Sequence, residues 1–276
     1  MIMPYEVYAL KFSERSDRVR ADSFLFDDHE VVHPIDYFLW VIRNEERTVV
    51  VDTGYDAEEG AHRGRPILRD PGACLTDMGI APETVETVVI THLHYDHAGA
   101  LQRFPAATFH LQAAELAFAT GPCMCEPALN HPFTAAHICQ MVAKVFSGRV
   151  VFHQGDADLA PGIELIAIGG HSRGLQAVRV MTQKGWLVLA SDASHFFENY
   201  LQRKMFPIVV DAEATLRGFD RLRELAEAPH QVIPGHDPLV RRLFPLLAGN
   251  PESAGLYRLD VEPLVDPKAL LADILP

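Results

Sequence analysis

The 276-residue sequence contains no apolar run that approaches the ~20 residues needed to span a bilayer. Its first residues, Met1 to Glu6, lack the basic region and apolar core of a secretory signal. Basic residues are scarce: 24 lysines and arginines stand against 37 acidic residues, which gives a net charge of −13. Nucleic acids and anionic membrane surfaces require clustered cations. We therefore expect a cytoplasmic protein with neither nucleic acid nor membrane as a partner.

Cysteine is also sparse, and the sequence has no low-complexity linker and no internal repeat. The spacings of Cys74, Cys123, Cys125 and Cys139 match neither a zinc knuckle nor a redox CxxC pair. We interpret them as reduced thiols, although Cys123 and Cys125 could also contact a substrate. Apolar residues make up 48% of the chain, enough for a substantial core. We expect one domain over residues 1–276, with an irregular tail from about residue 245.

Strand-rich stretches are followed by helix-rich stretches in both halves of the chain. The expected strands are 5–12, 37–42, 48–54, 85–90, 107–111, 150–153, 163–168, 176–182, 186–190 and 231–233. The expected helices are 75–80, 113–119, 135–146 and 213–228, the last with Asp211 as its N-cap. Residues 5–12 are predicted to form an edge strand, and 37–54 a hairpin. This pattern favours an α/β fold, a four-layer αββα sandwich in which two sheets pack face to face.

Four polar residues gather directly after the expected strand 85–90: His92, His94, Asp96 and His97. In an extended segment, the side chains of residues two positions apart point to the same side, so His92 and His94 can bind one ion. Asp96 and His97 lie just beyond, where a turn can direct them to a second ion. Imidazole and carboxylate groups suit zinc and similar divalent metals. Four ligands are too many for one catalytic ion and too few for two, so others must come from elsewhere.

Three later residues repeat this placement of a polar side chain at a strand end: His171, Asp192 and His236. A single late histidine is more often a surface or hydrogen-bonded core residue, but the repeated placement favours metal ligands. Five histidines and two aspartates suffice for two ions that share one carboxylate. We therefore expect two divalent metal ions as cofactors, with Zn²⁺ as the first choice and manganese, iron and cobalt also compatible.

The ordered set resembles the metallo-β-lactamase superfamily. The similarity extends from Asp-Thr-Gly at 52–54, through His-x-His-x-Asp-His at 92–97, to Gly-His-Asp at 235–237. The resemblance implies a first metal held by His92, His94 and His171. It implies a second metal held by Asp96, His97 and His236, with Asp192 bridging the two ions. It also implies that Asp52 orients one of the ligand histidines.

The resemblance is closest to the quorum-quenching N-acyl homoserine lactone lactonases. In the β-lactamases of this fold a cysteine stands where this chain has Asp192. Glyoxalase II-like enzymes need basic residues near the C-terminus, where this chain has only Arg258 and Lys268 after residue 245. We therefore expect hydrolysis of a small lactone, most of all an N-acyl homoserine lactone. Pyridoxolactonase-like or glyoxalase II-like hydrolysis of another small lactone, ester or thioester is the alternative. A metal-binding protein without catalysis is disfavoured, because all seven ligands are present.

The expected reaction is attack by a hydroxide that bridges the two metals. Two metal ions that share a water lower its pKa from about 15.7 to about 7. Asp96 is placed to pass a proton to the leaving oxygen. The lactonases usually carry a tyrosine three residues after the bridging aspartate, and here that residue is His195. Histidine can donate a similar hydrogen bond or transfer a proton, so His195 is expected to be catalytic with Asp96. The alternative is that His195 marks a different substrate.

Apolar side chains are expected near the mouth of the site, where they would receive an acyl chain. The candidates are Phe24, Phe26, Tyr37, Met124, Phe133, Phe146, Phe196 and Phe197. The apolar N-terminal segment and the Pro-rich tail are compatible with a homodimer.

Overall fold

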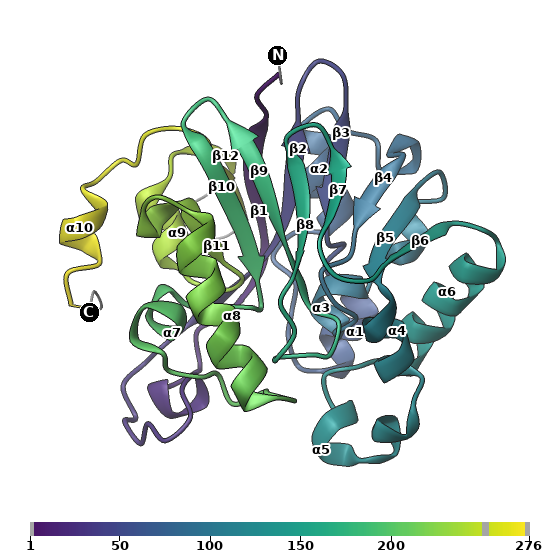
Figure 1. Cartoon of the computed structure of the whole chain (residues 1–276), viewed down its shortest axis with the longest axis horizontal. Helices are drawn as coiled ribbons and strands as arrows, with labels where there is room; N and C mark the ends of the chain where they lie inside the picture. The colour runs from purple at the N-terminus through teal and green to yellow at the C-terminus, as the bar shows by residue number, and fades with distance from the viewer. Residues whose placement is uncertain (1–2, 250–253, 274–276) are drawn as a thin grey trace.

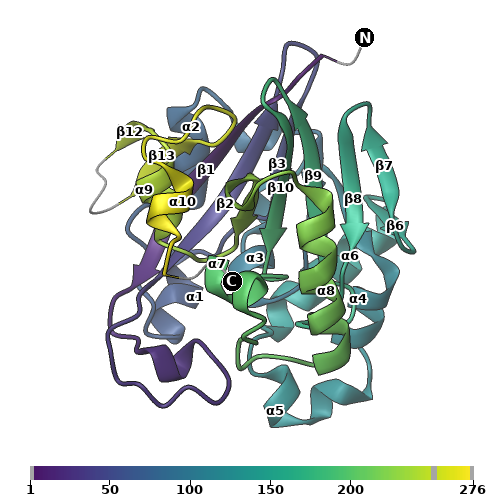
Figure 2. The same ribbon diagram turned by 60° about the vertical axis from the view of Figure 1, so that its left-hand side comes forward.

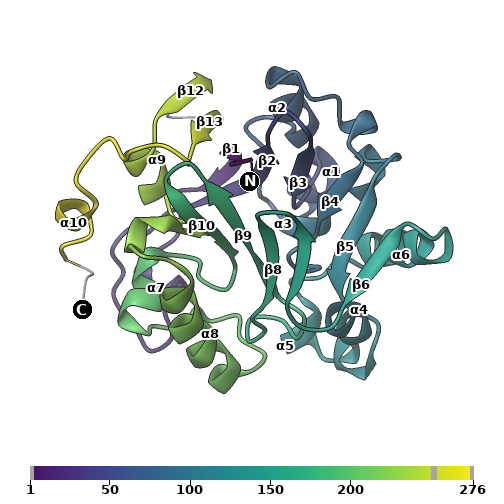
Figure 3. The same ribbon diagram turned by 45° about the horizontal axis from the view of Figure 1, so that its top comes forward.

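Two β-sheets packed face to face form the centre of the molecule (Figure 1). The computed structural model describes residues 3–249 and 254–273. The larger sheet has the strand order β12-β13-β1-β2-β3-β4-β5-β6, and the smaller sheet has the order β11-β10-β9-β8-β7. Helices lie outside both sheets, with α1 and α2 on one side and α8 on the other (Figure 3). The prediction of a four-layer αββα sandwich is confirmed.

The elements have the following bounds. The larger sheet consists of β1 (Glu6–Arg15), β2 (Ile35–Arg43), β3 (Thr48–Val51), β4 (Thr87–Val89), β5 (Thr108–Gln112), β6 (Val150–His153), β12 (Leu246–Gly249) and β13 (Gly255–Arg258). The smaller sheet consists of β7 (Ala157–Ala160), β8 (Ile163–Ala167), β9 (Gln176–Thr182), β10 (Gly185–Ser191) and β11 (Val232–Pro234). The α-helices are α1 (Ala57–His62), α2 (Pro71–Asp77), α3 (Tyr95–Ala98), α4 (Ala113–Ala119), α5 (Pro127–Asn130), α6 (Ala135–Phe146), α7 (Phe197–Gln202), α8 (Ala212–Leu225), α9 (Leu239–Leu243) and α10 (Pro267–Leu270).

The inner strands β1, β2 and β3 of the larger sheet are buried on both faces. Trp40 of β2 points into the core between the sheets, together with Val178 of β9, while its neighbour Leu39 points into a second core under the helices. Met141 of α6 packs into that second core. A strand with two buried faces needs a continuous apolar run rather than an alternating one. This explains the uninterrupted apolar stretch from Tyr37 to Ile42.

The C-terminal segment differs from two of our predictions, the edge position of the strand at 5–12 and the irregular tail from about residue 245. β1 is not an edge strand, because it pairs with β2 on one side and with β13 on the other. The segment after residue 245 is not irregular, since it returns to the larger sheet as β13 and β12. Each of these strands has only four residues, and the pairing of β13 with β1 joins residues about 250 positions apart in the chain. A run this short has no readable period, so the sequence pattern missed it.

The remaining elements largely follow the sequence pattern. The hairpin of β2 and β3 and the helix α6 lie where we expected them. Asp211 caps α8 by accepting the Ala214 N–H. α2 begins earlier than predicted, because Asp70 caps it and Pro71 occupies its first turn. None of the helices in residues 3–249 and 254–273 has the length and apolar character of a membrane span.

The sheet topology gathers several strand ends at one end of the sandwich. β3, β4 and β5 run parallel, as do β10 and β11. The carboxyl ends of parallel strands meet at the same edge, so the loops that follow them are brought together. α3, which follows β4, lies at that end of the sheets (Figures 1 and 2).

Candidate metal centre

The ends of β3 and β10 carry the first signs of a functional site. Asp52 and Ser191 have φ angles of 62° and 47°, in the left-handed region that non-glycine residues rarely adopt. Such strain persists where the surroundings impose it, and it is concentrated at functional sites. The Asp52 carboxylate accepts two hydrogen bonds from Thr91, one from the backbone N–H and one from the hydroxyl, each of 2.7 Å. These bonds tie the end of β3 to the end of β4.

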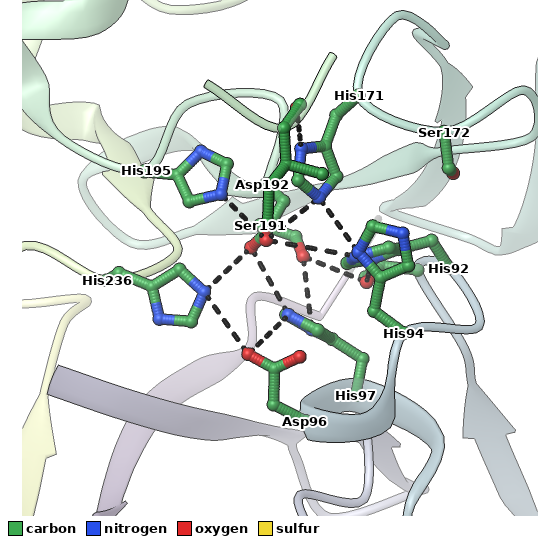
Figure 4. A network of polar contacts seen from close by, with 12 residues as sticks. His92, His94, Asp96, His97, His171, Ser172, Ser191, Asp192, His195 and His236 are labelled. Atoms are coloured by element: carbon green, nitrogen blue, oxygen red, sulfur yellow. Dashed lines mark hydrogen bonds and ion pairs between the residues drawn. The ribbon is translucent and has the colours of Figure 1, made fainter. Parts of the chain in front are cut away.

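All seven expected ligands come together at this end of the sandwich, each at most 7% exposed (Figure 4). Their ligand atoms fall into two groups, in each of which all atoms lie within 4.8 Å of one another. The first group is His92, His94, His171 and Asp192. The second group is Asp96, His97 and His236.

Asp192 faces both groups, with one carboxylate oxygen toward each. Its Oδ2 lies 3.3 Å from His171 Nε2 and 3.8 Å from His92 Nε2. Its Oδ1 lies 3.2 Å from His97 Nε2 and 3.1 Å from His236 Nε2. Asp192 follows β10, which lies between β11 and β9 in the smaller sheet. A single residue at the end of a strand that is paired on both sides therefore connects the two groups.

Three of the rings are held by hydrogen bonds from their other nitrogen. His97 Nδ1 contacts Asp52 Oδ2 at 2.7 Å. His171 Nδ1 and His236 Nδ1 contact the backbone carbonyls of Ile208 and Asp36 at 2.7 and 2.8 Å. Partners of this kind fix the ring orientation, so that Nε2 points toward the centre. The expected contact between Asp52 and a histidine of the cluster is confirmed, and that histidine is His97.

Charge is distributed unequally over the cluster. Burial and the neighbouring His97 hold the pKa of His92 well below its usual range, and burial and His171 do the same for His94. Burial also disfavours charge on His97, but the carboxylates, with Asp192 foremost, raise its pKa well above the usual value. The centre thus combines two imidazoles held neutral with buried carboxylates that favour a positive charge nearby, on His97 or on a bound cation.

Several of the expected ligand atoms are buried without a hydrogen-bond partner in the part of the chain that the structure describes. His92 Nε2, His97 Nε2 and Asp192 Oδ1 are buried and have no hydrogen-bond partner among the described residues. His94 Nδ1 and His171 Nε2 face each other at 3.0 Å. Each buried polar atom without a partner costs about 1–3 kcal/mol. Divalent cations would satisfy these nitrogens and carboxylates at once, so the residues fit a metal centre.

His195 borders the cluster, and Asp96 belongs to its second group. His195 Nε2 lies 3.0 Å from Asp192 Oδ2, and its ring stacks on Phe206 with centroids 3.6 Å apart. Asp96 Oδ2 lies 3.7 Å from His97 Nε2 and 3.6 Å from His236 Nε2. The structure therefore brings both residues that we expected to be catalytic into the same centre.

A small cavity of about 50 Å³ opens onto the cluster. Besides cluster residues, its lining includes Tyr37, Phe206, Arg18 and Arg65. Of the eight apolar candidates for the mouth, Tyr37 alone is in this lining. Apolar side chains serve core, surface and pocket alike, so their type in the sequence could not locate the mouth.

The other seven apolar candidates do not line this cavity, although the Phe133 ring packs edge-on against the His94 ring with centroids 4.6 Å apart. Phe26 and Phe146 are 97% and 89% exposed. Phe24, Phe133, Phe196 and Phe197 belong to the buried cores, and Met124 packs against one of them.

Glu115 supports the site and was missed in the sequence. Its buried carboxylate accepts hydrogen bonds from Leu93 N at 2.9 Å, Gly174 N at 2.8 Å and Ser172 Oγ at 2.6 Å. It thereby ties the segment that carries His92 and His94 to the segment that carries His171. The available signal was a single charged residue in the otherwise apolar stretch of α4. Arg18, Arg65 and Phe206 come from irregular segments and had no such signal.

Known proteins share both the sequence pattern and the architecture. Residues 37–271 match the family model described as the metallo-beta-lactamase superfamily. N-acyl homoserine lactonase AttM of Azorhizobium caulinodans is 28% identical over 237 residues, which cover 76% of this chain and 84% of that protein. N-acyl homoserine lactonase AiiB of Agrobacterium fabrum is 30% identical over 222 residues, which cover 72% and 78%.

Two solved structures illustrate the similarity of fold. A quorum-quenching N-acyl homoserine lactone lactonase superposes with a TM-score of 0.71 at 21% identity, over 86% of this chain and 94% of that one. AidC, a dizinc quorum-quenching lactonase, superposes with a TM-score of 0.68 at 14% identity, over 96% and 97% of the two chains.

Proposed function

Because the chain belongs to the metallo-beta-lactamase superfamily, we propose that it is a dinuclear metal-dependent hydrolase that opens the ring of a small lactone, with N-acyl homoserine lactones as the first candidate substrates. The observation that carries the proposal is Asp192, whose two oxygens face two separate groups of ligand atoms. The names of the relatives support a lactone as substrate. In this proposal residues 1–276 act as one hydrolase domain.

The two groups would each hold one ion. We assign His92, His94 and His171 to the first ion, and Asp96, His97 and His236 to the second, with Asp192 shared. Nitrogen and carboxylate ligands of this kind favour Zn²⁺. When bound, the metals supply Lewis-acid activation of a water and of the substrate carbonyl.

The protein side chains would orient the substrate and move the proton. His195 lines the cavity, and its Nε2 lies at the Asp192 carboxylate, within reach of a carbonyl placed at the centre. Its role is to donate a hydrogen bond to the carbonyl oxygen on which negative charge develops. Addition of water to the carbonyl carbon breaks the ring C–O bond, and the departing alkoxide needs a proton. In this proposal an Oδ atom of Asp96 takes up the proton that the attacking water loses and delivers it to the departing alkoxide.

The alternative is hydrolysis of another small ester or thioester at the same centre. The cavity is narrow, which favours small substrates over polymers. The surrounding residues, rather than the ligands, would decide between a lactone and an open-chain ester, because the ligand set activates either carbonyl.

Metal analysis and a substrate panel test the proposal directly. Protein loaded with Zn²⁺ and desalted should contain about two metal ions per chain by elemental analysis. Proton release in a pH-stat should be fastest with N-acyl homoserine lactones and other γ-lactones, and slow with thioesters and nitrocefin. Fewer than one metal per chain would refute the dinuclear centre. Thioester turnover without lactone turnover would instead favour the alternative.

A further inference from the structure

Two arginines share the small cavity with the metal-ligand cluster. Arg18 follows β1, and Arg65 lies between α1 and α2. Both side chains line the cavity together with His94, Asp96 and His195, and both are half-buried. Since the cavity measures only about 50 Å³, a substrate that reaches the cluster must touch or displace these side chains.

Neither arginine has a carboxylate partner. Arg18 donates from Nη2 to the Asp22 backbone carbonyl, and its buried Nε has no hydrogen-bond partner. Arg65 donates from Nη1 to the hydroxyl of Tyr95. Within residues 3–249 and 254–273, no carboxylate oxygen lies within 4.0 Å of either guanidinium. By contrast, the neighbouring Arg20 pairs with both Asp27 and Glu198.

The cavity wall is therefore a local concentration of positive charge. Burial lowers the pKa of Arg18, and repulsion from Arg15 and Arg65 lowers it further, while Tyr37 and Asp22 act in the opposite direction. Asp96 is the carboxylate that acts on Arg65, and it is already assigned to the second ion. This wall belongs to a protein with a net charge of −13. Arg18 also lies over the Phe206 ring at 5.4 Å and Arg65 over the Tyr95 ring at 4.9 Å, but neither contact neutralises the charge. Half-buried cations without a carboxylate partner are costly, so their presence at a binding cavity points to an anionic ligand.

Guanidinium groups recognise one kind of anion with particular geometry. The planar fork of N–H donors matches the two oxygens of a carboxylate, and such charged hydrogen bonds are about twice as strong as neutral ones. Hydrolysis of any lactone also creates a carboxylate, but that group forms at the carbonyl carbon, beside the metal ligands. The arginines therefore suit a second carboxylate, carried elsewhere on the substrate.

We propose that Arg18 and Arg65 bind a carboxylate substituent of the substrate, so that the preferred substrates are small lactones with an acidic side group. An N-acyl homoserine lactone whose acyl chain ends in a carboxylate is the simplest example. This inference rests on the proposed lactonase function and narrows its substrate class.

A matched pair of substrates isolates the effect of the charge. N-succinyl-L-homoserine lactone and N-(4-methylpentanoyl)-L-homoserine lactone have the same length and branching, with a carboxylate in one and an isopropyl group in the other. The Zn²⁺-loaded enzyme should show a kcat/KM at least about tenfold higher for the acidic lactone. Arg18→Met and Arg65→Met keep the apolar stems and should each lower this ratio toward one. Arg69→Met is the control, because Arg69 is exposed and pairs with Asp77 away from the cavity, and the ratio should not change.

A binding measurement separates this inference from the proposed function. The succinyl and 4-methylpentanoyl derivatives of 3-aminopyrrolidin-2-one are lactams that resist hydrolysis. In titration calorimetry the succinyl lactam should bind at least about tenfold more tightly, and either arginine substitution should abolish the difference. Arginine-dependent binding without turnover of any lactone would uphold the anion site and refute the lactonase.

Two outcomes would overturn the inference while the lactonase stands. The first is equal turnover of both lactones with no effect of the arginine substitutions. The second is a ratio near one, together with weaker inhibition by hydrolysed product in the arginine variants. That second result would assign the arginines to the carboxylate that the reaction creates.

Discussion

The floor and the wall of the cavity are built in different ways. The floor consists of the seven clustered ligands, which follow strands of the two sheets and are at most 7% exposed. The wall includes Arg18, Arg65 and Phe206, which lie in irregular segments between regular elements. Strands hold the floor to a fixed geometry, while loops allow the wall to vary without disturbing the sheets. In the proposed function, the floor therefore determines the type of reaction and the wall determines the substrate.

The largest effect is expected at the residue that joins the two halves of the floor. Asp192→Ala should lose metal and lower kcat/KM by roughly 10³-fold, since the Lewis-acid contribution is worth several kcal/mol. Elemental analysis and lactone kinetics on the same preparation would measure both. Asp192→Asn, which keeps the size of the side chain, should retain more metal. An alanine variant that retained two ions and near-normal turnover would show that the reaction does not depend on Asp192. That result would contradict the assignment of the reaction type to the floor.

Removal of the metals should destabilise the floor and therefore the whole domain. At a free metal concentration of 100 times Kd, binding stabilises the folded state by about 2.7 kcal/mol. A chelator should accordingly lower Tm by about 5–10 °C in scanning calorimetry. Arg18→Met, a change in the wall, should show the same difference between loaded and chelated protein. A chelator-insensitive Tm would contradict the predicted coupling of metal and fold.

Asp52→Ala tests the support under the floor. The loss of the 2.7 Å contact with His97 Nδ1 should weaken metal affinity by about 10–100-fold, the usual effect of removing such a partner. Competition with a chromogenic chelator would measure it. Asp56→Ala is a matched control, because Asp56 caps α1 and should cost only about 0.5–2 kcal/mol of stability, with metal affinity unchanged. Equal metal affinity in the Asp52 variant and the control would remove Asp52 from the metal centre.

His195 lies where floor and wall meet, and the smallest effect is expected there. His195→Phe keeps a ring to stack on Phe206 but removes the donor, so kcat should fall about tenfold with two metals still bound. His195→Tyr restores a donor and should recover part of the rate. If the Phe variant retained full kcat, His195 would line the cavity without a role in the reaction.

Much of the floor could be predicted from the chain because its geometry is local or periodic. His92, His94, Asp96 and His97 lie within six residues, and each later ligand stands at a recognisable strand end. Glu115 was missed, since its contacts with Leu93, Ser172 and Gly174 are long-range and leave only one charged residue in an apolar helix as a signal. The apolar candidates for the mouth, from Phe24 to Phe197, were mostly misplaced. An apolar side chain has the same sequence signature in a core, on a surface or in a pocket.

The sequence by itself determined the two-sheet architecture and the set of residues that converge, because the apolar period and strand-end chemistry are properties of short segments. Only the tertiary structure decided which oxygen of Asp192 faces which group of ligand atoms. It also decided that β13 pairs with β1 and that Arg18 and Arg65 line one cavity. Those relations join residues that are far apart in the chain, and they depend on how the two sheets and their loops pack.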